Sequence, residues 1–143
     1  MKENGVLSLA KDIARLTADS IDIVLLRTIV ELGPKDKDIK GLKLLERLLA
    51  QYTNPHSAYR IMGPLHITYG LRLGDAHLPS KESLRNALTD LEIQPDTQPL
   101  EVGKALLLKV SKALSQIGYV VFHGRVSGAS HELDAISVDD CRP

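Results

Sequence analysis

Arginine and histidine are the residues of this chain whose types and spacing are best suited to chemistry. An imidazole titrates near neutral pH, so it can take a proton from a hydroxyl group or give one to a leaving oxygen. A guanidinium adds a permanent charge and paired donors that stabilise negative charge developing on phosphorus. An Arg is followed closely by a His at three places, which are Arg60 to His66, Arg72 to His77 and Arg125 to His131. Such a pair has the groups needed to cleave a phosphodiester without a metal ion.

The setting of the three pairs favours Arg72 and His77. Gly63-Pro64 interrupts the first pair, and the third pair lies in a stretch rich in Gly and Ser. Arg72 and His77 lie at the end of an expected helix, with two further helices after them. Five residues span about 140° on a continuous helix, so the two side chains share a cleft only if the helix ends between them, and Gly74 offers that end. Asp75 either orients His77 by accepting a hydrogen bond from its second ring nitrogen or has a structural role in the turn.

Other chemistries find less support in the sequence. Acids and histidines gather near the C-terminus without a zinc spacing, so no metal site is expected. They are His123, His131, Glu132 and Asp134. No Gly-rich phosphate loop is present, so no cofactor is expected. The single cysteine, Cys141, excludes an intramolecular disulfide framework and favours a cytoplasmic location.

Composition and charge limit the function classes further. The chain has 143 residues, 43% of them hydrophobic, which suits one domain with a sizeable core. Its 18 basic residues balance 18 acidic ones, which disfavours a broad surface for long nucleic acid. Only residues 35–47 are locally basic, and acids interleave there, so this segment is either a solvated face with internal charge pairs or a phosphate contact. One Phe, four Tyr and no Trp disfavour a stacking platform.

The spacing of apolar residues predicts an all-α, up-and-down bundle of about five helices. The expected helical segments are 6–32 with a cap near Asp19, 36–52, 58–74 with a restart or kink at Pro64, 80–91 and 100–117. Ser80 is a suitable cap for the fourth segment. No apolar run approaches the roughly 20 residues that cross a bilayer, and no signal peptide is recognised, so we expect no membrane segment.

The pattern weakens after residue 117. Residues 119–122 either extend the last helix or form a short strand, and residues 123–130 are typical of a flexible turn. Residues 133–138 either pair back as a second strand or form an irregular tail. The expected division is therefore a helical domain over residues 1–122 and a C-terminal tail over residues 123–143.

The segment from Leu71 to His77 resembles the signature of the HEPN superfamily, small helical proteins in which an Arg is followed after four to six residues by a His. The resemblance covers roughly residues 6–122. It implies a homodimer in which two Arg/His pairs meet across the two-fold axis. It also implies a metal-independent endoribonuclease of toxin–antitoxin or other defence systems, with RNA as substrate and an antitoxin or another protein as partner.

The resemblance makes Arg72 and His77 the catalytic pair, with Asp75 beside them and no cofactor. The residue after the Arg is commonly polar in the family, whereas this chain has Leu73. A second interpretation stays open in the sequence. The chain is then a non-catalytic helical dimerisation or protein-interaction module, cut from a larger protein.

Overall fold

The computed structural model describes residues 3–75, 81–94 and 96–136, and this part of the chain is all α-helical, without strands. Its elements are α1 (Glu3–Thr17), η1 (Ala18–Ser20), α2 (Ile23–Ile29), η2 (Pro34–Asp36), α3 (Gly41–Tyr52), α4 (Pro55–Asp75), α5 (Lys81–Asp90) and α6 (Pro99–Ile136). The predicted all-α class is confirmed.

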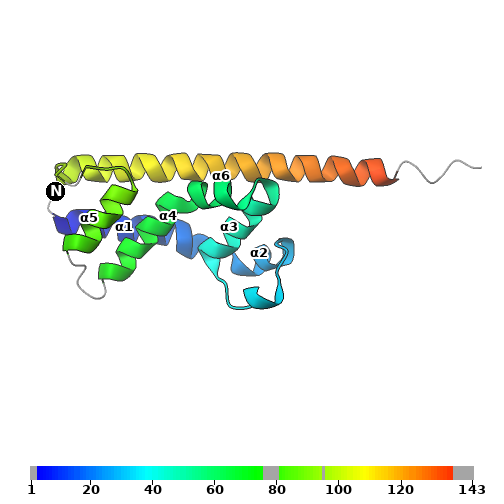
Figure 1. The fold of residues 1–143 in the computed structure, drawn as a ribbon, viewed down its shortest axis with the longest axis horizontal. Helices are drawn as coiled ribbons and strands as arrows, with labels where there is room; N and C mark the ends of the chain where they lie inside the picture. Colours follow the sequence, from blue (N-terminus) through cyan, green and yellow to red (C-terminus); the bar gives the residue numbers. More distant parts are fainter. Residues whose placement is uncertain (1–2, 76–80, 95, 137–143) are drawn as a thin grey trace, which may run out of the picture.

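Helix α6 is the longest element and runs along one edge of the molecule (Figure 1). The shorter helices pack on one side of it, and its C-terminal end extends beyond them (Figure 1). Helix α4 is the central element of the packed body, because it contacts α1, α3, α5 and α6. The residues of α4 therefore reach several neighbouring helices.

The core forms where the apolar stripes of the helices meet. The main cluster combines residues of α1, α3, α4, α5 and α6, and its most buried members include Ala10, Leu49, Met62, Leu91 and Leu106. A smaller cluster joins α2 and α3 through Leu26, Val30, Leu44 and Leu48. These positions follow the three- and four-residue spacing of amphipathic helices, which explains why the helical segments were predictable.

Helix α4 begins with a capped turn and passes through a proline. The Ser57 N–H donates to Asn54 Oδ1 at 2.8 Å, and Pro55 occupies the first helical position. Pro64 lies inside the helix, which continues to Asp75, so of the two expected alternatives at Pro64, a restart or a kink, the restart is wrong. Pro64 removes one helical donor. Packing of α4 against α1, α3 and α6 offsets that local loss.

The C-terminal segment differs most from the prediction. Helix α6 continues through residues 123–136, so the expected turn at 123–130 and the strand alternative at 133–136 are wrong, and the predicted boundary after residue 122 falls inside a helix. Gly124 has a packing role, because a Cβ there would lie 2.3 Å from the Tyr52 ring at the end of α3. Residues 137–143 lie outside the described part.

Helix α5 ends in a left-handed residue that is not glycine. Glu92 has φ 57°, and the Ile93 N–H donates to the Leu88 carbonyl at 2.8 Å, as in a Schellman cap. We expect Glu92→Gly to raise the free energy of unfolding by about 0.5–1 kcal/mol, because glycine adopts this conformation without strain. The Glu92 ion pair that the change removes is exposed and contributes little.

Urea unfolding checks this expectation, with Glu92→Ala as the control. The alanine variant loses the same ion pair but keeps a Cβ in the left-handed region. A glycine variant no more stable than the alanine variant would contradict the assignment of strain to Glu92.

Candidate functional site

Arg72 lies in the last turn of α4 and is fixed by a carboxylate from a distant segment. Its Nη1 donates to Asp19 Oδ1 at 2.6 Å and to Asp19 Oδ2 at 2.7 Å. Its guanidinium also lies 5.8 Å from the Tyr69 ring centre. Hydrogen bonding to Asp19 raises the pKa of Arg72 above its usual value, so the group stays charged. The Arg72 side chain is 28% exposed, which leaves it accessible from solvent.

The other two residues of the predicted catalytic set are only partly located. Helix α4 ends at Asp75, close to the end expected from Gly74. His77 lies outside the described residues, and so does the side chain of Asp75. The approach of His77 to Arg72 therefore stays a prediction.

The pair Arg60 and His66 is brought to one cavity. Both residues are on α4 and line a cavity of about 600 Å³. Its remaining walls are formed by Tyr59, Gly63, Pro64, Ile67, Asp90, Leu91, Glu92 and Lys109. Because α4 is continuous through Pro64, the six residues from Arg60 to His66 span about 240°, so the two side chains leave the helix about 120° apart although both line the cavity. The third pair, Arg125 and His131, lies within α6, and its side chains are not described.

His66 is held by a carboxylate from the neighbouring helix α3. Its Nε2 lies 2.5 Å from Glu46 Oε2, and Lys43 Nζ lies 3.0 Å from Glu46 Oε1. Burial would raise the pKa of Glu46, but hydrogen bonds from Lys43 and His66 outweigh it and hold this pKa below its usual value. His66 therefore faces the neighbouring helix α3. A carboxylate that orients an imidazole is the arrangement that prepares a histidine for proton transfer.

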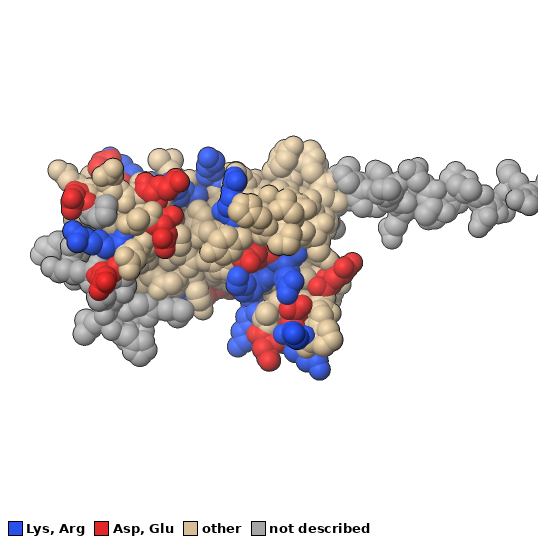
Figure 2. All heavy atoms as spheres, in the orientation of Figure 1, with Lys and Arg blue, Asp and Glu red and all other residues tan. Residues whose placement is uncertain are grey.

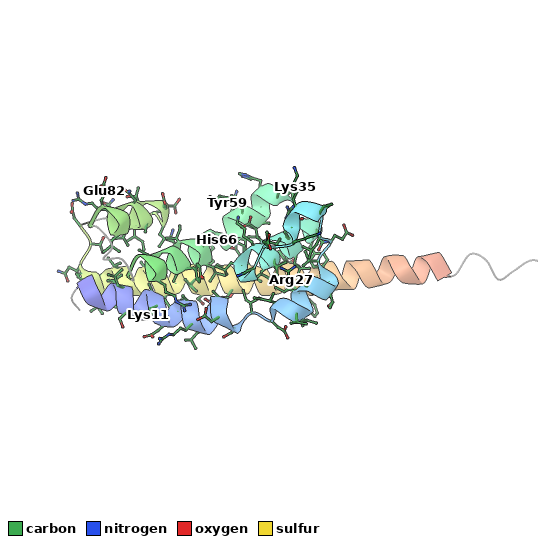
Figure 3. The ribbon with its side chains drawn as sticks, turned by 90° about the horizontal axis from the view of Figure 1, so that it is seen from below. Lys11, Arg27, Lys35, Tyr59, His66 and Glu82 are labelled. Carbon is green, nitrogen blue, oxygen red and sulfur yellow. The ribbon has the colours of Figure 1, made fainter. Side chains whose placement is uncertain are left out.

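The opposite wall of the cavity carries a second ion pair. Lys109 Nζ on α6 lies 2.9 Å from Glu92 Oε2. This hydrogen bond lowers the pKa of Glu92, and the charge of Lys109 lowers it further. Figure 3 shows Tyr59 and His66 on the upper side of the view, opposite Lys11 on α1. The cavity thus joins three helices on one side of α4.

Sequence reasoning missed four of these residues as a group: Tyr59, Glu46, Glu92 and Lys109. Glu46 and Lys109 reach the site from α3 and α6, and no spacing within the chain relates them to α4. The sequence related Arg60 to His66 by spacing alone, and nothing in that spacing connected the pair to residues of α3 or α6.

The locally basic segment 35–47 forms internal charge pairs. Arg47 Nη2 lies 2.8 Å from Asp36 Oδ1, and Lys43 pairs with Glu46. Figure 2 shows basic and acidic side chains mixed over the region of α2 and α3, at the lower right of the view. These contacts show the internal charge pairs of the first sequence interpretation for Lys43 and Arg47, and the phosphate contact stays a prediction.

Removal of the Glu46 charge is expected to make stability less dependent on pH. A carboxylate whose pKa is lower in the folded than in the unfolded state stabilises the fold at pH values above its pKa in the unfolded state, which is about 4.5 here. That stabilisation is lost as the pH falls through the pKa of the carboxylate in the folded state. Glu46→Gln should therefore lower the free energy of unfolding at pH 7 by about 1 kcal/mol and by less as the pH falls below 4.5.

Urea unfolding at pH 7 and pH 3 measures the effect, and Glu101→Gln is the matched control. Glu101 pairs with Lys104 at 2.7 Å, but its side chain is 55% exposed, so its loss should change little. A Glu46→Gln deficit of equal size at both pH values would exclude the charge as its cause.

Helix α6 presents a broad apolar surface on the side away from the core. Its exposed members are Leu100, Leu107, Leu108, Leu114 and Phe122, each between 44% and 71% exposed. Residues 99–124 are long and apolar enough to cross a membrane by length and composition, which the sequence expectation had excluded. The same test is passed by core helices, and Val102, Leu106 and Val110 on the other face of α6 are buried. Contiguous exposed apolar surface is typical of sites where proteins contact a partner.

Comparison with known proteins adds no relative, because no family model, curated protein or solved structure matches this chain. Within the described part of the chain, no three His, Cys, Asp or Glu side chains are grouped to hold a metal ion. Function is therefore inferred from the arrangement of the chain's own residues.

Proposed function

We propose that the chain is a metal-independent endoribonuclease of HEPN type that acts as a homodimer. The observation that carries this proposal is the setting of Arg72, a partly exposed guanidinium fixed at the end of α4 beside the segment that contains His77. Its constant positive charge suits a group that stabilises a phosphorane-like transition state.

The reaction needs only groups from the chain and the RNA. Neutral His77 takes the proton of a ribose 2′-hydroxyl, whose oxygen bonds to the adjacent phosphorus while the bond from phosphorus to the 5′-oxygen breaks. An imidazolium supplies the proton to that leaving oxygen, either from the same residue or from the second subunit. Arg72 binds the non-bridging oxygens as charge develops. The products are a 2′,3′-cyclic phosphate and a 5′-hydroxyl.

Asp19 has a positioning role in this proposal. Its carboxylate fixes the Arg72 guanidinium through Nη1, which restrains the long side chain before substrate arrives. Asp19 is 45% exposed, so phosphate can approach the pair from solvent.

RNA cleavage in the presence of EDTA tests the proposal. Purified wild-type dimer should cleave single-stranded RNA, and His77→Ala should abolish that cleavage, whereas His56→Ala should retain it because His56 is an exposed residue at the start of α4. Equal activity of the His77→Ala and wild-type proteins would overturn the assignment of His77.

A second candidate function is a non-catalytic helical interaction module. The observation that favours it is the apolar surface of α6, on which five large side chains are each between 44% and 71% exposed. One experiment distinguishes the endoribonuclease from the interaction module. An interaction module forms a dimer or a complex with a partner protein but leaves every tested RNA intact in EDTA.

A further inference from the structure

The cavity beside α4 has the chemistry of a ligand site that is separate from Arg72. Its walls come from α4, the end of α5 with the turn that follows it, and α6, whereas Arg72 is bound to Asp19 of η1. We infer that this cavity binds one ribonucleotide, either free or as a unit of an RNA strand. The inference concerns binding alone and does not rest on cleavage by Arg72 and His77.

Cationic and imidazole groups in the walls suit the phosphate. Arg60 carries a planar fork of donors that matches phosphate oxygens. Lys109 adds a second positive charge and is held in place by Glu92. His66 is fixed through Nε2 by Glu46, so Nδ1 is the ring nitrogen that can meet a ligand.

Acceptor groups in the same walls require a ligand that also carries donors. Asp90 and Glu92 both line the cavity, and their negative charges balance those of Arg60 and Lys109. Pro64 has no N–H to donate to the carbonyl of Arg60, four residues earlier, which leaves that oxygen without its usual helical donor. Inorganic phosphate offers little to these groups, whereas ribose hydroxyls and base amino groups donate to them.

The apolar part of the cavity suits a base. Tyr59 lies at the rim with 62% of its surface exposed, and Pro64, Ile67 and Leu91 complete the apolar lining. Aromatic side chains stack on nucleobases regardless of sequence. The volume of about 600 Å³ falls within the range of small-molecule sites.

Gly63 allows the cavity to be filled without disturbing the core. A Cβ at Gly63 would meet nothing within 4 Å, and the same is true of Gly70 on the same helix, which does not line the cavity. Gly63→Leu should therefore fill the cavity, and Gly70→Leu is its matched control. Both changes replace a helical glycine with a better helix former, so both variants should fold.

Isothermal titration with each of the four 5′-ribonucleoside monophosphates, inorganic phosphate and a short single-stranded RNA tests the inference. Wild type and Gly70→Leu should bind at least one mononucleotide or the RNA in the micromolar to millimolar range, and Gly63→Leu and Arg60→Gln should bind it at least about tenfold more weakly. Binding of mononucleotides identifies a free ligand, and binding of the RNA alone identifies a strand unit.

Three results would overturn the inference: no binding of any nucleotide or RNA to wild type, unchanged binding by Gly63→Leu, or inorganic phosphate binding as tightly as the best nucleotide. RNA cleavage in EDTA is measured on the same variants, so that a failure of ligand binding is distinguished from a failure of the proposed ribonuclease activity. A protein that binds but does not cleave retains the ligand site and loses only the ribonuclease proposal.

Discussion

Arg72→Ala is expected to lower the rate of RNA cleavage in EDTA by about 10²-fold or more, because it removes the charge that stabilises the transition state. Arg72→Lys keeps the charge but loses the planar pair of donors, so a partial loss of about tenfold is expected. Initial rates on a fluorescently labelled RNA oligonucleotide measure both effects.

Two controls separate catalysis from structure. Arg85→Ala removes an exposed arginine whose nearest carboxylate, Asp96, lies 3.9 Å away, and it should leave the rate unchanged. Asp19→Asn breaks the charge pair of Arg72 but keeps the guanidinium, so it should retain far more activity than Arg72→Ala. Equal losses in Asp19→Asn and Arg72→Ala would show that Arg72 acts only by tying α4 to η1.

Charge introduced on the apolar surface of α6 is expected to convert a dimer that forms through this surface into a monomer. The surface lies on the other side of the molecule from the C-terminal end of α4 (Figure 1), so such a dimer belongs to the interaction-module function and does not bring two Arg72 residues together. Leu107 and Leu114 are 48% and 44% exposed and lie seven residues apart. Ser111 lies between them and Gly118 follows Leu114, so the four residues are separated by steps of four, three and four residues. This spacing is that of a helix–helix seam. Leu107→Glu combined with Leu114→Glu should weaken association by at least about 100-fold, because each charge would be desolvated in the interface.

The available area is consistent with such an association. At about 200 Å² for a large apolar side chain, the five exposed residues of α6 present roughly 500–600 Å², which is a large part of the ~800 Å² per partner of a standard interface. Analytical ultracentrifugation measures the mass. Val24→Glu is the control, because Val24 is 77% exposed on the separate helix α2. A monomeric wild type, or a dimer that survives the double change, would exclude this surface.

The sequence was sufficient for elements whose ends carry strong local signals. Apolar spacing marks the buried face of α6 as far as Ile117, and the predicted third helix, 58–74, lies within α4 and begins three residues after its observed start at Pro55. The glycines and serines of residues 123–130 indicated a turn instead, whereas α6 continues through them to Ile136 and extends beyond the shorter helices (Figure 1).

The candidate sites were also hard to predict, because they depend on contacts between residues far apart in the sequence. Proline inside a helix is unfavourable on its own, and only the packing of α4 against its neighbours explains why the helix continues through Pro64. The contacts of His66 with Glu46, of Lys109 with Glu92 and of Arg72 with Asp19 join separate helices. Their separations of 17 to 53 residues follow no periodic pattern, so they became visible only in the folded chain.

The chemistry assigned to Arg72 and His77 requires a ribose 2′-hydroxyl and no metal ion. The most direct measurement is therefore the cleavage, in EDTA, of an RNA oligonucleotide and of the same sequence with every 2′-hydroxyl replaced by hydrogen. The account predicts that the wild-type protein cleaves the RNA to products with 2′,3′-cyclic phosphate ends and leaves the deoxy oligonucleotide intact. Cleavage of both oligonucleotides, or of neither by a folded dimer, would contradict it.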